Sequence, residues 1–393
     1  MLACLTILTA MVALAKGACT VNIESQLNAD APLLLLNNQL WAPNGDTLRM
    51  DAGDIIQIAC PRRTIVNTGT VTADIQCVFD QTFNLGGILV DISSVSCANR
   101  PPHPMSSIQN THQLCGNGGT LLNIGFVVPD FIPFVTYIQS CYNLQTNSAI
   151  YSRHVIRGQA INDKIVDRRK TSFRAGDIDT KFRDAYLQRS QQTRFRNLLG
   201  PVGGNRYFVT NAKFLARGHL APDADGIFRP WQQASYYYVN AVPIWQKVNN
   251  CNWKAVENAA REMAARLRED VLIFTGVHDI LTLPNDHGHQ IPITLRVEGI
   301  EVPKWIWKII KWPEMDAAMV LVTHNDPFRQ DALPADELLC PDVCAQYGWT
   351  KENYRDSERG YTYCCTVASL LHVIPSIPPE AHSTNVLHFN TFN

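Results

Sequence analysis

The sequence lacks several features that would assign a function directly. Its 393 residues contain no Walker-type phosphate loop, no dinucleotide fingerprint and no internal repeat. Beyond the first fifteen residues, no apolar run reaches the length of about 18 residues that spans a bilayer. Charged residues make up only 18% of the chain, and the net charge is −1. We therefore expect a soluble globular protein with no membrane partner, long enough for two domains.

The amino terminus also lacks a basic residue, although it otherwise has the layout of a secretory signal. Residues 1–15 are almost wholly apolar, and Ala13-Leu14-Ala15 offers the small-x-small pattern of a signal-peptidase site. This pattern indicates a signal peptide over residues 1–15 and a secreted, extracellular protein. A buried N-terminal helix is the alternative.

Cysteine, by contrast, is plentiful. Of twelve cysteines, Cys4 falls within the proposed signal and eleven remain. In an oxidising compartment most of these form disulfides, and an odd number leaves at least one without an intramolecular partner. The spacings Cys340-x-x-x-Cys344 and Cys364-Cys365 are also roughly zinc-like, so a thiolate metal site is the rival interpretation.

Two regions of the chain differ in composition. Residues 19–142 carry six cysteines, few charges and short β-rich runs, which predicts a small disulfide-rich β domain over residues 16–145. Residues 151–270 carry 21 Lys and Arg against 11 Asp and Glu, a net +10 that the rest of the chain offsets. Such a basic block favours an anionic partner, such as a phosphate backbone, over a merely solvated face. The β-rich runs are residues 55–58, 71–75, 88–90 and 134–138.

Residues 146–393 form the second expected domain. Its clearest element is a helix over residues 252–268, in which Val256, Ala260, Met263 and Leu267 make one apolar stripe. Three asparagines at its start, Asn249, Asn250 and Asn252, suit helix capping. The other elements that we expect are a helix near residues 181–199 and strands at residues 206–209, 271–276, 302–312 and 317–322.

Residues around this helix could hydrolyse a phosphodiester bond. His219 would be neutral near pH 7 and could take a proton from water. A hard divalent cation would stabilise charge on phosphorus and on the leaving oxygen, and Mg²⁺ needs only one or two protein oxygens, such as the Asn249 amide. Glu257 could accept hydrogen bonds from metal-bound water, and Arg261, four residues on, could orient it or contact a phosphate. Each residue alone also fits a structural role, as a helix cap or an ordinary i,i+4 pair.

One segment carries a family resemblance. Residues 216–225, Ala-Arg-Gly-His-Leu-Ala-Pro-Asp-Ala-Asp, resemble the Asp-Arg-Gly-His signature of the DNA/RNA non-specific endonucleases. The similarity continues through residues 233–237, 239–243 and 249–253 to Glu257 and Arg261. It implies an α+β fold, a ββα-metal nuclease domain with a central antiparallel sheet, preceded here by the disulfide-rich β domain. The cysteine-rich front half and residues 361–365 look like the arthropod branch, with crustacean duplex-specific and insect double-strand nucleases.

The resemblance also implies roles for individual residues. His219 would be the general base, Asn249 the direct Mg²⁺ ligand and Glu257 the holder of metal-bound waters, with Mn²⁺ as a possible substitute metal. Asn240 would support the metal site or bind substrate. The arginines would contact phosphate or support the site: Arg217, Arg261, and one of Arg169 and Arg174.

Two positions depart from the family pattern. Ala216 stands where the signature has aspartate, and Asp223 or Asp225 could compensate for the missing carboxylate. Cys251 stands where many relatives have glycine, and we expect it to be the unpaired cysteine. The resemblance favours an endonuclease that cleaves DNA, RNA or both with little sequence preference and needs no protein partner. A binding protein that has lost catalysis, or an enzyme acting on a nucleotide pyrophosphate, is the alternative.

Two further groups have both a functional and a structural interpretation. A second metal site is conceivable at His278, His287 and His289, near Asp279 and Asp286. The neighbouring Gly, Pro and Asn residues favour a solvent loop instead. The alternating pair Trp305 and Trp307 could stack on bases or pack in the core.

Overall fold

The structure is a computed structural model of the chain. It describes residues 17–28, 30–98, 104–129, 132–166, 171–176, 182–208, 213–297, 299–331 and 333–390. The expected signal peptide at residues 1–15, and Arg169, lie outside the described residues. Within the described part of the chain, no helix is both long and apolar enough to cross a membrane.

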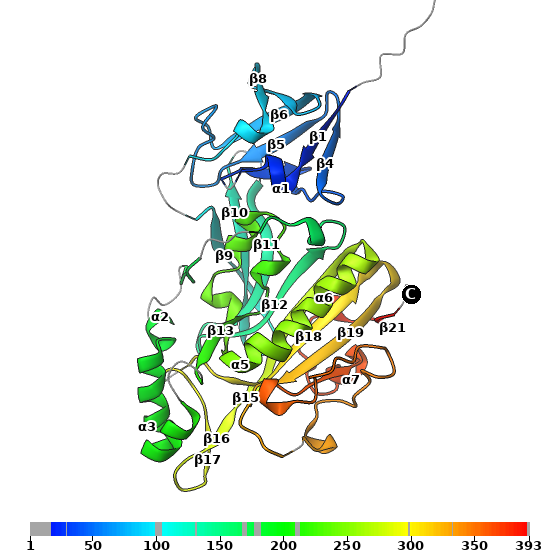
Figure 1. The fold of residues 1–393 in the computed structure, drawn as a ribbon. Helices are drawn as coiled ribbons and strands as arrows, with labels where there is room; N and C mark the ends of the chain where they lie inside the picture. The colour runs from blue at the N-terminus through cyan, green and yellow to red at the C-terminus, as the bar shows by residue number, and fades with distance from the viewer. Residues whose placement is uncertain are drawn as a thin grey trace, which may run out of the picture.

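A nine-stranded sheet forms the centre of the molecule (Figure 1). Its strands follow the order β20-β19-β18-β15-β12-β11-β10-β9, and every pair along this path is antiparallel. The short strand β21 pairs in parallel with β19. The predicted α+β class with a central antiparallel sheet is therefore confirmed. The strands are β9 Ser106–Cys115, β10 Gly119–Val128, β11 Ile132–Asn143, β12 Ser148–Arg157, β15 Asp270–Ile280, β18 Pro303–Trp312, β19 Ala317–His324, β20 Thr362–Cys365 and β21 Asn385–Val386.

The front part of the chain is a separate β structure, at the top of Figure 1. Strands β3-β2-β5-β6-β7-β8 make a six-stranded sheet, and β1 pairs with β4. Two disulfides, Cys19–Cys77 and Cys60–Cys97, cross-link it. The predicted disulfide-rich β region is thus present. Its elements are β1 Ala18–Asn22, α1 Ile23–Gln26, β2 Leu33–Leu36, β3 Gln39–Leu40, β4 Thr47–Asp51, β5 Ile55–Ala59, β6 Thr72–Phe79, β7 Thr82–Leu85 and β8 Ile88–Asp91.

The strands that precede residue 145 do not all belong to this front part. β9, β10 and β11 pair with one another and, through β12, with the rest of the large sheet, and the Cys115–Cys141 disulfide joins β9 to β11. Alternating strand patterns look the same in either sheet, so composition alone does not show which partner a strand takes. We propose that the boundary between the two parts lies between residues 98 and 106 rather than near 145.

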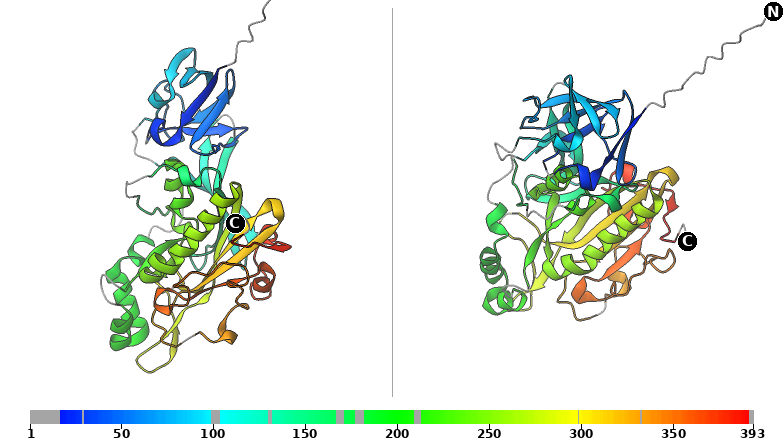
Figure 2. Two further views of the ribbon diagram at one scale, coloured as in Figure 1. Left: turned by 45° about the vertical axis from the view of Figure 1, so that its right-hand side comes forward. Right: turned by 45° about the horizontal axis from the view of Figure 1, so that its top comes forward.

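The long helix α6, Lys254–Leu267, lies across one face of the large sheet in each view (Figures 1 and 2). Its predicted stripe is confirmed, because Val256, Ala260, Met263 and Leu267 are all buried. The helix ends at Arg268, whose φ of 55° is left-handed and stops the α-helical pattern. The remaining helices are α2 Phe182–Ala185, α3 Gln188–Tyr207, α4 Arg229–Ala234, α5 Gln246–Val248 and α7 Val367–Leu371.

The predicted strand at residues 206–209 is wrong. Arg206 and Tyr207 are the last residues of α3, and Val209 is not among the described residues. The helix kinks at Gly200, where φ is 86°, and restarts after Pro201. The carboxylate of Asp286 accepts hydrogen bonds from the amides of Val202 and Gly203 and so caps the restarted helix.

The opposite face of the sheet is covered by the C-terminal segment. Trp305 and Trp307 of β18 are 1% exposed and belong to a core cluster with Tyr363 and the C-terminal Ile374 and Ile377. The core-packing interpretation of the tryptophan pair is therefore confirmed. Because side chains alternate along a strand, the intervening residues of β18 face α6 instead. Ile306 and Ile310 accordingly belong to the same core cluster as the buried residues of α6.

Candidate active site

The Arg-Gly-His motif lies on a two-stranded hairpin. β13, Leu215–His219, pairs antiparallel with β14, Ala241–Trp245. Strand alternation places Arg217 and His219 on one face and Gly218 on the other. A Cβ at Gly218 would lie 2.1 Å from Cδ1 of Ile244, so only glycine fits between Arg217 and His219.

The His219 ring is enclosed by aromatic side chains. Its centroid lies 4.7 Å from those of Phe173 and Tyr236, and Nε2 is buried with no hydrogen-bond partner among the described residues. Burial lowers the pKa of His219 to about 4, against the opposing charges of Asp223 and Asp225. The imidazole is therefore neutral at pH 7, as a general base requires.

Asn240 lies immediately behind this histidine and is fully buried. Its amide nitrogen donates to the carbonyls of Ala221 and Ser235, at 2.8 and 2.9 Å. Its oxygen accepts from Ala221 N at 2.9 Å and Ser152 Oγ at 3.0 Å. With the side chain engaged in this way, Asn240 holds the loop that follows His219 in place.

Arg217 lies among three aromatic rings. Its guanidinium carbon is 5.1, 5.7 and 6.0 Å from the ring centroids of Tyr186, Tyr238 and Phe173. Its Nε is buried and has no hydrogen-bond partner among the described residues. Phe173 contacts both Arg217 and His219, so the guanidinium and the imidazole lie against one aromatic ring.

Asn249 lies within a helix rather than at its start. A helical run begins with α5 at Gln246, passes through a π turn over Asn249–Trp253 and continues as α6. The predicted capping role is therefore wrong, because Asn249 has helical φ and ψ of −59° and −41°. Asn252 instead donates to the carbonyls of Asn353 and Gly360. A π turn absorbs about one extra residue, so Asn249 and Glu257 share a face as an i,i+7 pair would in an α-helix.

Glu257, on this helix face, is partly buried, and the buried cation of Lys308 acts on it. Burial raises the pKa of Glu257 to about 7, and the charges of Lys308 and Arg261 oppose the rise. Lys308 is 0% exposed, and its ammonium donates to Thr275 Oγ1 and the Leu220 carbonyl. Burial lowers the pKa of Lys308 to about 8, against the charges of Asp225 and Glu257.

Asp225 connects the His219 loop to α6. Its carboxylate accepts from Arg261 Nη1 at 2.6 Å and contacts His154 Nε2 at 2.8 Å. Burial would raise the pKa of Asp225, but the hydrogen bond from His154 and the charges of Arg261 and Lys308 prevail and hold it at about 2. Arg261 also donates to Asn258 Oδ1, so its guanidinium is engaged within the protein and does not pair directly with Glu257.

The structure brings three of the predicted residues, His219, Glu257 and Arg261, around the carboxylates of Asp223 and Asp225. The charges of Asp223 and Asp225 act on the pKa of both His219 and Glu257, so the imidazole and the helix carboxyl lie near the same two acidic groups. Sequence reasoning missed Lys308 and His154. Tyr236, within the matched family segment, donates its hydroxyl to Asp223 at 2.6 Å. A lysine in the apolar strand of residues 303–312, on the face opposite the tryptophans, was the available signal for Lys308.

The structure also describes the contacts of three other predicted positions, Ala216, Cys251 and Arg174. Ala216 pairs with Ile244 in the hairpin. Cys251 is the one cysteine among the described residues that forms no disulfide, as predicted. The guanidinium of Arg174 donates to Gln233 O at 2.6 Å and to Ser106 Oγ at 3.2 Å, and it lies 4.3 Å above the Tyr237 ring.

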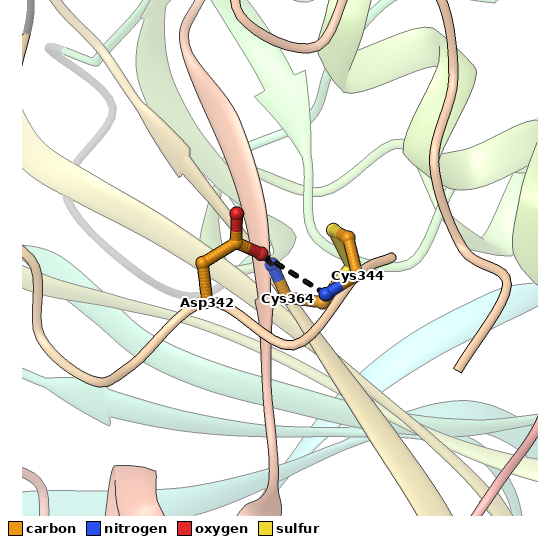
Figure 3. A group of neighbouring side chains, drawn as sticks. All are labelled: Asp342, Cys344 and Cys364. Atoms are coloured by element: carbon orange, nitrogen blue, oxygen red, sulfur yellow. Dashed lines mark hydrogen bonds between the residues drawn. A yellow bond between two sulfur atoms is a disulfide. The ribbon is translucent and has the colours of Figure 1, made fainter. Parts of the chain in front are cut away.

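The suggested second metal site does not assemble in the described residues. Asp286 caps α3, and the amides of His287 and His289 donate to Asn285, as expected for a solvent loop. A group of possible ligands does occur elsewhere, at Asp342, Cys344 and Cys364 (Figure 3). There the two sulfurs form a disulfide and Asp342 accepts from both cysteine amides. With Cys340–Cys365, this confirms disulfides rather than thiolate zinc in the tail.

Three insect salivary proteins are similar to this chain over most of its length. The salivary endonuclease of Lutzomyia longipalpis is 31% identical over 347 residues, 87% of this chain and 78% of that protein. Salivary protein Tsal1 of Glossina morsitans morsitans is 25% identical, covering 95% of this chain and 94% of its own. The salivary endonuclease of Culex quinquefasciatus is 23% identical, covering 90% and 88%.

The profile of one protein family spans most of the large sheet. The profile of the DNA/RNA non-specific endonucleases matches residues 117–370, from β10 to α7, and includes every site residue described above from Arg217 to Lys308. Its members are metal-dependent nucleases. This chain belongs to the DNA/RNA non-specific endonuclease family and is a nuclease hydrolase.

Proposed function

We propose that the chain is a secreted, Mg²⁺-dependent endonuclease that hydrolyses DNA and RNA with little sequence preference. The observation that carries the proposal is the partly buried, neutral His219, whose buried Nε2 has no partner among the described residues. A base without an internal partner is suited to accept a proton from a water molecule at the scissile phosphate. Salivary relatives and five disulfides support secretion.

The donor set fits Mg²⁺. The Asn249 amide and the Glu257 carboxylate offer oxygens from one face of the helix, and Mg²⁺ prefers oxygen ligands and retains several waters. Asn249 would bind the ion directly and Glu257 would accept hydrogen bonds from its waters. When bound, the ion would stabilise negative charge on the phosphoryl oxygens and the leaving oxygen.

The remaining residues act on the substrate and on the base. His219 takes the proton from water, and Asn240 fixes the loop behind it. Arg217, beside His219 on the same strand face, provides a cation for the phosphate. Arg261 is a positioning residue in this proposal, because its guanidinium holds Asp225 rather than facing outward.

The test is a cleavage assay with plasmid DNA and duplex RNA. EDTA should abolish cleavage and added Mg²⁺ should restore it. His219→Ala should lose most activity while its circular dichroism and unfolding midpoint match the wild type. Full activity in this variant would overturn the proposed role of His219, and binding without shortening would favour a nucleic-acid-binding protein instead. Hydrolysis confined to a nucleotide pyrophosphate would change the substrate class.

A further inference from the structure

A groove lies at the start of the helical run that carries Asn249. It has a volume of about 850 Å³ and is formed by the end of α3, the start of α5 and the loops at residues 327–330 and 355–358. Five cationic side chains and two acidic ones line it, together with the aromatic rings of Tyr207, Trp245 and Phe328. The groove is therefore both positively charged and aromatic.

Most of the cations in this groove already have carboxylate partners. Lys247 pairs with Glu358 at 2.7 Å, Arg329 with Glu337 at 2.6 Å, and Arg355 with Asp342. Arg206 and Lys213 form no ion pair with a described residue. Each lies over a ring instead, Lys213 Nζ 5.3 Å from the Phe328 centroid and the Arg206 guanidinium 5.5 Å from that of Tyr207.

Phe328 is held in a fixed position at the wall of the groove. Its ring makes edge contacts with Tyr207 and Trp245, at 5.1 and 4.8 Å between centroids. Asp326 accepts from the Phe328 amide at 3.0 Å. Asn325, fully buried, accepts from the Trp245 amide and donates to two further carbonyls, which fastens the loop to β14.

The groove lies within reach of a strand bound at His219. Trp245 pairs with Leu215, and Leu215 is four residues from His219 on the same strand, a separation of about 13 Å. That is about four nucleotide steps of B-form DNA or fewer of an extended single strand. Aromatic rings beside unpaired cations are the usual features of sites where bases stack and phosphates are neutralised.

We infer that this groove is a flanking-strand subsite, in which an unpaired nucleobase stacks on Phe328 while Lys213 and Arg206 bind the adjacent phosphates. The inference rests on the proposed function, since it places part of the same nucleic-acid substrate. It assigns the basic, aromatic groove to a single-stranded segment some nucleotides away from the scissile bond.

The test measures binding separately from hydrolysis. A fluorescein-labelled 12-nucleotide single strand is titrated in EDTA with wild type, Phe328→Leu and the double variant Arg206→Gln/Lys213→Gln. Phe328→Leu should weaken binding about tenfold, the effect of one lost stack. Each removed cation should reduce the slope of log K against log salt by about 0.7. Phe79→Leu and Arg49→Gln, on the front β structure, are matched controls that should bind as wild type does.

Cleavage then gives a second readout. With Mg²⁺, kcat/KM for the 12-nucleotide strand should be lower in Phe328→Leu than in the wild type. A dinucleotide is too short to reach the groove, so the variant and the wild type should cleave it with equal kcat/KM. Wild-type binding by both groove variants would overturn the inference, as would an equal loss on both substrates. Arg206 and Lys213 are both exposed, so the double variant Arg206→Gln/Lys213→Gln remains informative if Phe328→Leu unfolds. Binding that depends on Phe328 without any hydrolysis would instead reject the proposed function and support the inference that the groove binds a single strand.

Discussion

Arg261 and Asp225 form a buried ion pair, with 2.6 Å between Nη1 and Oδ1, that joins α6 to the loop after His219. Asp225→Asn would leave the guanidinium charge without its partner, in a place where its side chain is only 13% exposed. We expect the free energy of unfolding to fall by about 3–5 kcal/mol, measured by urea denaturation at pH 7. Asp225→Asn/Arg261→Met, which removes both charges, should be less destabilised. Equal losses in the two variants would show that the ion pair is not the cause.

The close contact at Gly218 predicts a second result. Gly218→Ala places a methyl group against Ile244 and should displace the strand that positions Arg217 and His219. We expect a loss of about 1–3 kcal/mol in stability and a larger loss in plasmid cleavage. Gly218→Ala/Ile244→Ala removes the clashing atoms and should recover part of the activity. A double variant no more active than Gly218→Ala would argue against this steric explanation.

His324 predicts how stability depends on pH. Its ring is buried against Trp305, and burial lowers its pKa from the ordinary 6.5 to about 3. Between these values the unfolded chain binds more protons than the folded one, so stability falls as the pH is lowered from 6.5. This histidine should account for about 2 kcal/mol between pH 7 and pH 5.

The measurement is urea unfolding of the metal-free protein at both pH values. His324→Phe keeps an aromatic ring in the pocket and should show a smaller loss on acidification than the wild type. His372→Gln, at an exposed position, is the control and should follow the wild type. An unchanged pH dependence in His324→Phe would remove His324 as a cause.

The position of β9–β11 in the large sheet predicts the outcome of truncation. A chain beginning at residue 104 keeps this sheet intact, and we expect it to fold and to cleave plasmid. A chain beginning at residue 146 loses three strands and leaves β12 with an unpaired edge, which promotes aggregation. Soluble yield and circular dichroism distinguish the two. A folded, active chain from residue 146 would return the boundary to the place where composition suggested it.

Local patterns predicted many elements of the fold. The apolar period identified α6, and β-branched runs identified β5, β8, β15, β18 and β19, because these signals depend on neighbours along the chain. The partners of β9–β11 depend on contacts between distant residues, which no local pattern records. The helical Arg206 and Tyr207 depend on a cap from Asp286, about 80 residues away in the sequence.

The site residues also divide into those that the sequence identified and those that depend on contacts between distant parts of the chain. His219, Asn249 and Glu257 were found through the family motif, because spacing alone favoured a structural role for each. The π turn at Asn249 and the contact between His154 and Asp225, 71 residues apart, have no sequence signature. Lys308 was visible only as a charge in an apolar strand, and no local pattern shows that its charge acts on Glu257.

The two disulfides of the tail have a consequence for where the enzyme works. Cys340–Cys365 and Cys344–Cys364 fasten β20, and the segment before it supplies the carbonyls of Asn353 and Gly360 that hold Asn252. Asn252 lies in the π turn beside Asn249, so oxidation supports the helix that would carry the metal. A newly made chain whose thiols are still reduced lacks that support. We therefore expect full activity only after oxidation, which would spare the nucleic acids of the cell that makes the enzyme.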